Sequence, residues 1–183
     1  MNTLLKPILI LSLMVISISI YTLIASNPIK YNQSYKEILP ENLKVLVRDS
    51  FCDYSIPTEN QFIDEWKTYE HITKPMFAFS DFNGDSKNDY AVLLLSEKFK
   101  NVILVVFLSG NNDYSYTIYR IKKFDLNSNL IDVFISIEKK GYWECANGKK
   151  YIKHDGICVD LANESLSFSY YWANSIFRKF LCD

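Results

Sequence analysis

The sequence predicts an α+β protein in which two short N-terminal helices pack on a mainly antiparallel β-meander sheet, preceded by a signal or anchor helix. Two observations predict this class. Apolar residues at helical spacing occur between residues 40 and 66, whereas from Met76 onward runs rich in Val, Ile, Phe and Tyr alternate with short Gly, Asn and Asp turns. Because the strands follow the helices in series, the pattern is typical of an α+β fold.

The composition is that of a folded chain of single-domain size. The chain has 183 residues, of which 49% are hydrophobic and 22% charged, with only 5 Gly and 5 Pro. These values exclude disordered and collagen-like chains. The 20 Lys and Arg against 21 Asp and Glu leave no basic excess to hold a phosphate backbone. We therefore expect no nucleic-acid partner.

The N-terminus carries an export signal. Residues 8–25 read ILILSLMVISISIYTLIA without a charge, and Lys6 precedes them. The length lies on the border between a cleavable signal peptide and a membrane-spanning helix, so residues 1–26 are either a removed signal peptide or a retained anchor in the inner membrane. Both interpretations place a linker at 27–36 and a single domain at 37–183 outside the cytoplasm, in a periplasmic or other extracytoplasmic location.

Two short helices are expected next. The first covers residues 40–51, where the apolar residues recur at helical spacing and Pro40 suits the first turn. The second begins at Thr58, which forms a capping box with Gln61. Phe62 and Trp66 then stand four residues apart on one helix face, and we expect both rings in the core.

Eight strands are expected after the helices. The connections between the first four are too short for crossover helices, so neighbouring strands must be antiparallel. The second and third runs are apolar on both faces, which predicts central strands covered on each side. The predicted strands are residues 76–80, 90–96, 102–108, 114–121, 131–137, 156–161, 166–172 and 176–181.

The chain has four cysteines, all in the part expected to be exported. An even count outside the cytoplasm predicts two disulfides. The favoured pair is Cys145 with Cys158, which leaves Cys52 to pair with Cys182. Four buried thiols are the alternative, and zinc is disfavoured because no CxxC pair exists.

A short acidic loop joins the first two predicted strands. It reads Asp-Phe-Asn-Gly-Asp-Ser-Lys-Asn-Asp over residues 81–89. Oxygen ligands at alternate positions of a tight loop suit calcium, with a backbone carbonyl filling one gap. The predicted metal ligands are the side chains of Asp81, Asn83, Asp85 and Asp89 and the carbonyl of Lys87. The alternative is a metal-free hairpin in which these side chains accept hydrogen bonds from the loop's own amides.

At these residues the chain resembles the calcium loops of FG-GAP repeats, which run Asp-x-Asn-Gly-Asp-Gly-x-x-Asp between two strands. Ser86 stands where that pattern has its second glycine. The resemblance implies a hairpin-type ion loop with Asp81, Asn83, Asp85 and Asp89 as ligands. A single copy does not imply a propeller, which needs about four or more blades. The whole layout resembles small bacterial exported proteins that carry one such loop, a likeness that implies the fold and no activity.

No catalytic signature stands out. His71 and His154 are the only histidines, and neither belongs to a recognisable triad. We expect no enzyme, no catalytic residue and no organic cofactor. The densest aromatic run, Tyr170 to Trp172 with Phe177, is expected to serve core or edge packing rather than binding.

Three functions are consistent with these patterns. The first is an exported or membrane-anchored binding module, of inhibitor or immunity type, that meets a protein partner through its sheet face. The second is an exported metal-dependent hydrolase or carbohydrate-active accessory protein, and the third is a structural surface domain stabilised by calcium. A membrane contact is expected only through the N-terminal segment, if that segment is not cleaved.

Overall fold

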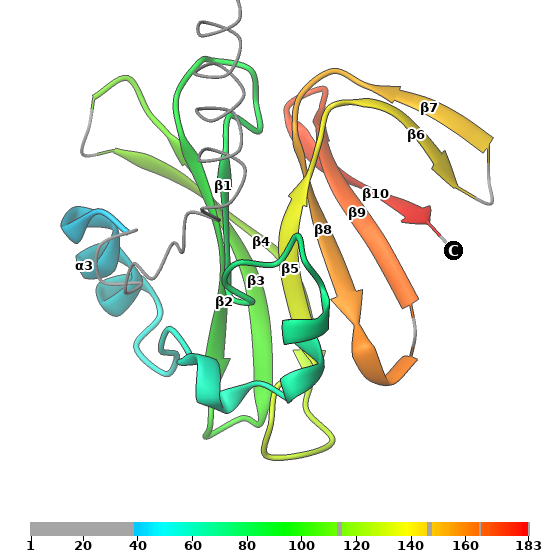
Figure 1. The fold of residues 1–183 in the computed structure, drawn as a ribbon. Helices are drawn as coiled ribbons and strands as arrows, with labels where there is room; N and C mark the ends of the chain where they lie inside the picture. The colour runs from blue at the N-terminus through cyan, green and yellow to red at the C-terminus, as the bar shows by residue number, and fades with distance from the viewer. Residues whose placement is uncertain (1–38, 113–114, 146–147, 165, 183) are drawn as a thin grey trace, which may run out of the picture. The chain divides into compact units, whose positions relative to one another are not determined.

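The computed structural model describes residues 39–112, 115–145, 148–164 and 166–182 (Figure 1). The predicted signal or anchor segment at 1–26 and the linker at 27–36 lie outside the described residues. Within the described ranges no helix is both long enough and apolar enough to cross a membrane.

The predicted fold class is wrong, because the structure is mainly β. It has three sheets of antiparallel strands and one α-helix among the described residues, not two helices on one sheet. The first predicted helix is present as α3 (Glu41–Ser50), with Pro40 at its N-cap and Leu43 and Val47 buried.

The second predicted helix is replaced by two short 3₁₀ segments, η1 (Glu59–Gln61) and η2 (Asp64–Thr68). The capping interaction itself is present, since Gln61 Oε1 accepts the Thr58 N–H at 2.8 Å. The helix stops because Ile131 competes for the backbone: its carbonyl accepts the Ile63 N–H at 3.0 Å and its N–H donates to Gln61 O at 2.8 Å. Phe62 and Trp66 are buried, as expected.

The first four strands form a meander, as predicted. Their order in the sheet is β1-β2-β3-β4, all antiparallel. A bulge in β4 leaves Ile121 without a partner, because Val105 pairs with Arg120 and Leu104 pairs with Lys122. The strands are β1 (Phe77–Ser80), β2 (Asp89–Ser96), β3 (Asn101–Ser109) and β4 (Tyr116–Asp125).

The remaining strands do not extend this meander. The second sheet has the order β10-β9-β8-β5, and a separate hairpin of β6 and β7 is inserted between β5 and β8. The sequence prediction missed this hairpin because its strands are short and rich in Lys, Gly and Glu. The strands are β5 (Val133–Glu138), β6 (Gly141–Cys145), β7 (Gly148–Ile152), β8 (Gly156–Leu161), β9 (Leu166–Ala173) and β10 (Ile176–Cys182), and η3 (Ala162–Glu164) joins β8 to β9.

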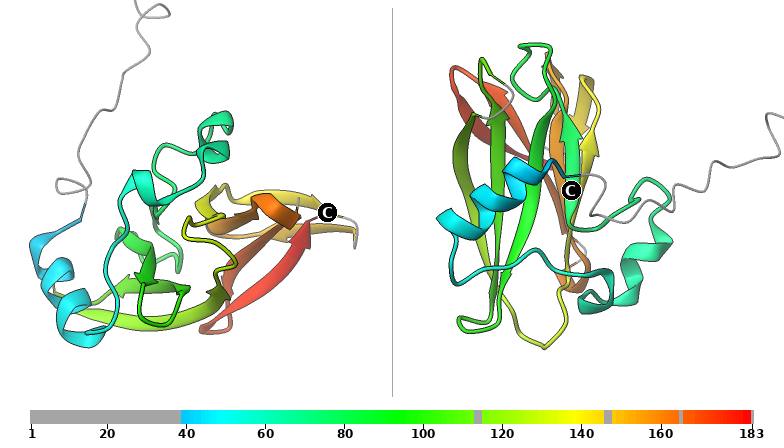
Figure 2. Two further views of the ribbon diagram at one scale, coloured as in Figure 1. Left: turned by 90° about the horizontal axis from the view of Figure 1, so that it is seen from below. Right: turned by 90° about the vertical axis from the view of Figure 1, so that its left-hand side faces the viewer.

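The central strand β3 is covered on both faces, which confirms the prediction for residues 102–108. On one face Phe107 meets Phe51, which follows α3, with ring centroids 6.3 Å apart. Figure 2 shows α3 crossing the strands of the first sheet on this side, with the second sheet behind them.

The other face of the first sheet packs on the second sheet. Phe124 of β4 stacks on Phe168 of β9 with centroids 6.4 Å apart, and Tyr119 meets Trp172 at 5.3 Å and Phe177 at 5.7 Å. The aromatic run near residue 170 therefore serves packing, as predicted. On the opposite edge the Ile135 N–H donates to Pro75 O at 2.9 Å, so β5 lies beside the start of β1.

Candidate functional site

The acidic loop between β1 and β2 is held together by its own amides. The Asp81 carboxylate accepts three backbone N–H groups, from Gly84 and Asp85 on one oxygen and from Ser86 on the other. The side-chain oxygen of Asn83 accepts the Asp85 N–H at 2.9 Å. This arrangement is the Asx-turn geometry that short acidic loops adopt.

The base of the loop is closed by Asp89, whose side chain is completely buried. One carboxylate oxygen accepts the Phe82 N–H at 3.0 Å, and the other accepts the Ser109 N–H at 2.8 Å. Burial raises the pKa of Asp89 from 3.8 to about 6, against the two hydrogen bonds, and the charge of Asp85 adds to the increase. Asp89 therefore fastens the loop to the end of β3.

Two further residues fix the loop's conformation. Phe82 is completely buried, so the loop is anchored in the core by its second residue. Ser86 has φ of 68°, the left-handed conformation that glycine adopts most easily. Serine thus takes the backbone conformation that suits the glycine of the FG-GAP pattern.

The structure does not assign a metal to these residues. Asp81, Asn83, Asp85 and Asp89 lie in or beside one loop, and each of the four side chains accepts at least one amide N–H. Lys87 is in the same loop, and its Nζ donates to Gly110 O at 2.6 Å. Across the part of the chain that the structure describes, no group of three or more His, Cys, Asp or Glu residues could hold a metal ion. Calcium binding stays a prediction from the sequence.

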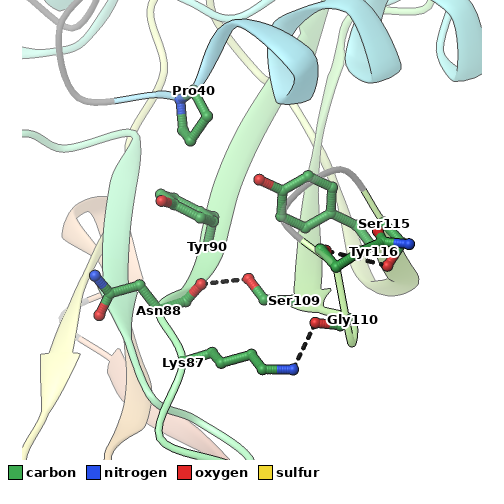
Figure 3. Close-up of a pocket in the computed structure, with 9 residues that line it drawn as sticks. Pro40, Lys87, Asn88, Tyr90, Ser109, Gly110, Ser115 and Tyr116 are labelled. Carbon is green, nitrogen blue, oxygen red and sulfur yellow. Dashed lines mark hydrogen bonds between the residues drawn. The ribbon is translucent and has the colours of Figure 1, made fainter.

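A cavity of about 420 Å³ lies directly beside the loop, on the face of the first sheet that α3 covers (Figure 3). We call it the tyrosine pocket, because the rings of Tyr90 and Tyr116 meet edge to face in its wall, 6.2 Å apart. Its lining residues are Pro40, Lys87, Asn88, Tyr90, Ser109, Gly110, Asn112, Ser115 and Tyr116.

The acidic loop and the tyrosine pocket are built together. Lys87 and Asn88 end the loop and form one wall, and they are tied to the opposite wall by two hydrogen bonds, from Lys87 Nζ to Gly110 O and from Ser109 Oγ to Asn88 O (Figure 3). Asp89 adds the bond to the Ser109 N–H beneath them. The loop therefore sets the shape of the pocket.

The tyrosine pocket has a polar and aromatic lining. Burial raises the pKa of Tyr90, with smaller contributions from Tyr116 and Asp89, so its phenol is neutral at physiological pH. The lining offers aromatic faces, hydroxyls, an amide and one ammonium group.

A second hollow, of about 480 Å³, lies beside Asp81, where the loop meets the turn before β8. Asp155 accepts hydrogen bonds from Ser80 Oγ at 2.7 Å and from the Lys140 N–H at 3.0 Å, and it pairs with Lys139 at 2.9 Å. Burial alone would raise the pKa of Asp155, but these hydrogen bonds lower it below its ordinary value. Ser80 belongs to β1 of the first sheet, whereas Lys139 and Lys140 follow β5 of the second sheet. The Asp155 carboxylate therefore ties the two sheets together.

Both predicted disulfides are wrong, because Cys52 and Cys158 are free thiols. The register explains the error. Cys158 lies in β8 opposite Ser136 and Ser169, whereas Cys145 ends β6 in a different sheet. Burial raises the pKa of the Cys158 thiol to about 12, and the charges of Asp160 and Glu138 add to the increase.

The tyrosine pocket was missed by the sequence prediction. Tyr90 and Tyr116 belong to predicted strands, and nothing in their local pattern separates them from other strand aromatics. Only the pairing of β2 with β3 and of β3 with β4 brings their rings together.

Comparison with known proteins returned nothing: no family model, no curated protein and no solved structure matches this chain. No family or homologue evidence indicates catalysis.

Proposed function

We propose that the protein is an extracytoplasmic binding module that takes up a polar group of a protein partner in the tyrosine pocket. The observation that carries this proposal is the cavity of about 420 Å³ in which two tyrosine rings stand beside Lys87, Asn88 and Ser115. Tyrosine is among the residues enriched in the energetically important parts of protein interfaces.

The lining defines the kind of group that fits. The edge-to-face rings of Tyr90 and Tyr116 offer apolar surface to an aliphatic stem or a flat group. An ammonium group has three donors, and Gly110 O takes one from Lys87. An acceptor-rich group, such as a carboxylate or a carboxamide of the partner, is therefore the best match.

The pocket is pre-formed, which favours binding. Three hydrogen bonds join its two walls: Lys87 Nζ donates to Gly110 O, Ser109 Oγ donates to Asn88 O, and the Ser109 N–H donates to the Asp89 carboxylate. A wall that is already fixed loses little side-chain freedom when a partner docks, so more of the contact energy remains as affinity.

The export proposal rests on the uncharged segment at residues 8–25, which the sequence alone supplies. The partner is then expected among proteins outside the cytoplasm. Fractionation of cells that produce the full chain would test this location separately from the pocket.

A capture experiment tests the pocket. The full chain, immobilised through a tag, is incubated with envelope extract, and the bound proteins are quantified by mass spectrometry. Tyr116→Ala and Lys87→Met should each lower recovery of a stoichiometric partner about tenfold, the effect of losing an interface residue worth about 1.4 kcal/mol.

Tyr142→Ala is the matched control, because Tyr142 lies on the β6–β7 hairpin and is 76% exposed. It should leave recovery unchanged. Equal recovery with the wild-type chain and both pocket variants, or no stoichiometric partner at all, would contradict the proposal.

A further inference from the structure

A separate cavity of about 290 Å³ opens between the inner faces of the two sheets, at the end where β4 leads into β5 and β8 leads into β9. It shares no lining residue with the tyrosine pocket. Its apolar floor is the stacked pair Phe124 and Phe168, which are 8% and 2% exposed. Val133, Leu161 and Leu166 complete the apolar part of the lining.

A lysine reaches this cavity from each of two strands. The bulge in β4 pairs Lys122 with Leu104, which places Lys122 and Phe124 on the same face as Tyr119, the face that meets the second sheet. Bulges commonly re-aim a side chain in this way next to functional sites. Lys179 of β10 lies with its Nζ 3.8 Å from the centre of the Phe168 ring.

These two ammonium groups are available to a ligand. Among the described residues the side chain of Lys122 forms no ion pair or hydrogen bond, and the contact of the Lys179 side chain is with the face of the Phe168 ring. By contrast, the neighbouring Lys123 pairs with Asp125 at 2.8 Å.

The acidic residues of the cavity lie on the other side of the phenylalanine pair. Lys122 comes two residues before Phe124 in β4, and Lys179 pairs with Tyr170, two residues after Phe168 in β9. The acidic groups follow the ends of the strands: Asp125 ends β4, Asp132 precedes β5 and Glu164 ends η3. The cavity is therefore cationic at one end, apolar in the middle and acidic at its mouth.

Glu164 is the acidic residue with most freedom to meet a ligand. Asp125 is paired with Lys123, and Asp132 accepts a hydrogen bond from Asn163. Glu164 is exposed and has no ion pair among the described residues. An ammonium group at the mouth of the cavity would find its counter-charge there.

From this arrangement we propose that the cavity is a binding site for a zwitterionic α-amino acid with an apolar side chain. The ligand carboxylate lies between Lys122 and Lys179, its side chain lies on Phe124 and Phe168, and its ammonium group faces Glu164. The volume is at the small end of the range of ligand pockets, which suits a single amino acid.

L-Phenylalanine is the probe for the test, measured with the full chain by isothermal titration calorimetry and by NMR chemical shifts. Two relatives separate the charges: N-acetyl-L-phenylalanine lacks the ammonium group, and L-phenylalaninamide lacks the carboxylate. We expect saturable binding of L-phenylalanine, and dissociation constants at least about tenfold higher for both relatives.

Variants locate the site. Lys122→Met and Lys179→Met keep the aliphatic stem and remove the charge, and each should raise the dissociation constant of L-phenylalanine about tenfold or more. Glu164→Gln should weaken L-phenylalanine but leave the weak binding of N-acetyl-L-phenylalanine unchanged. Lys123→Met, one residue along the same strand, is the control and should have no effect.

Three outcomes would overturn the proposal. They are the absence of saturable binding at millimolar L-phenylalanine, equal affinity for Lys122→Met, Lys179→Met and the wild-type chain, and equal affinity for all three probes. Because the tyrosine pocket variant Tyr116→Ala should bind L-phenylalanine normally, failure here and failure of the capture experiment are separate results.

Discussion

Gly84 offers the sharpest test of how the acidic loop is built. Its φ is 83°, and a Cβ at this position would lie 2.0 Å from Cε1 of His154, with both ring nitrogens within 2.6 Å. No real side chain tolerates such contacts, so Gly84→Ala must displace the His154 ring from the loop. The substitution therefore has two costs, backbone strain and lost packing between the sheets.

The magnitude follows from these two costs. A left-handed conformation costs an L-residue about 1–2 kcal/mol, and displacement of the ring adds about 1 kcal/mol of lost contacts. Alanine also lowers the conformational entropy of the unfolded chain, which stabilises the folded state by about 0.4–1 kcal/mol and offsets part of this loss. We expect Gly84→Ala to lower the free energy of unfolding by about 1–3 kcal/mol, which corresponds to a fall in Tm of roughly 3–10 °C.

Urea and thermal unfolding followed by circular dichroism would measure this change. Gly148→Ala is the control for strain without a clash, because Gly148 has φ of 105° and its Cβ would meet no atom within 4 Å. The double variant Gly84→Ala/His154→Ala should lose less stability than the sum of the two single variants, since the clash is then gone.

Two results would refute this reasoning. A loss below about 0.5 kcal/mol for Gly84→Ala would mean that the loop does not need the left-handed conformation. A double variant whose loss equals the sum of the single losses would mean that His154 does not rest on Gly84.

Three further predictions concern the acid at the loop base, the predicted ion and the thiols. Without calcium, Asp89 should lower the free energy of unfolding by about 3 kcal/mol between pH 4 and pH 7. The reason is that the unfolded carboxyl loses its proton near pH 4 and the buried one only near pH 6. Denaturant titrations of Asp89→Asn should show a flatter dependence of the free energy of unfolding on pH. A pH dependence equal to that of the wild-type chain would contradict this prediction. If calcium binds with the millimolar to submillimolar affinity of extracellular modules, 5 mM calcium should stabilise the chain by about 1–2 kcal/mol. Asp81→Ala should lose this effect in thermal melts with magnesium as the control, and no calcium effect would make the prediction wrong. Iodoacetamide at pH 8 should modify the exposed Cys52 rapidly but Cys158 only after unfolding, because burial raises the Cys158 pKa to about 12. Mass spectrometry after brief labelling checks this, and equal rates would contradict it.

The helical region shows why local patterns sometimes fail. The capping box at Thr58 and the spacing of Phe62 and Trp66 are real helix signals, and both rings are buried. The backbone of residues 61–63 nevertheless bonds to Ile131, far away in the chain. Two hydrogen bonds to a residue distant in the chain replace the helical ones, and no local pattern reveals that competitor.

The candidate site likewise combines a feature that local sequence predicts with one that depends on long-range strand pairing. The acidic loop was visible in the sequence, because Asp and Asn at alternate positions around Gly84 are a local signal. The tyrosine pocket next to it was not visible, because Tyr90 and Tyr116 become neighbours only through two strand pairings.

The sequence by itself determined the positions of eight strands, the first helix and the acidic turn, because each depends on the alternation or spacing of residues close together in the chain. Only the tertiary structure decided that the strands divide between two packed sheets, that β6 and β7 form a hairpin of their own, and that Cys52 and Cys158 remain thiols. These outcomes depend on which distant segments form backbone hydrogen bonds with each other and bury each other's apolar faces. Such a competition is settled by the whole chain and not by any stretch of it.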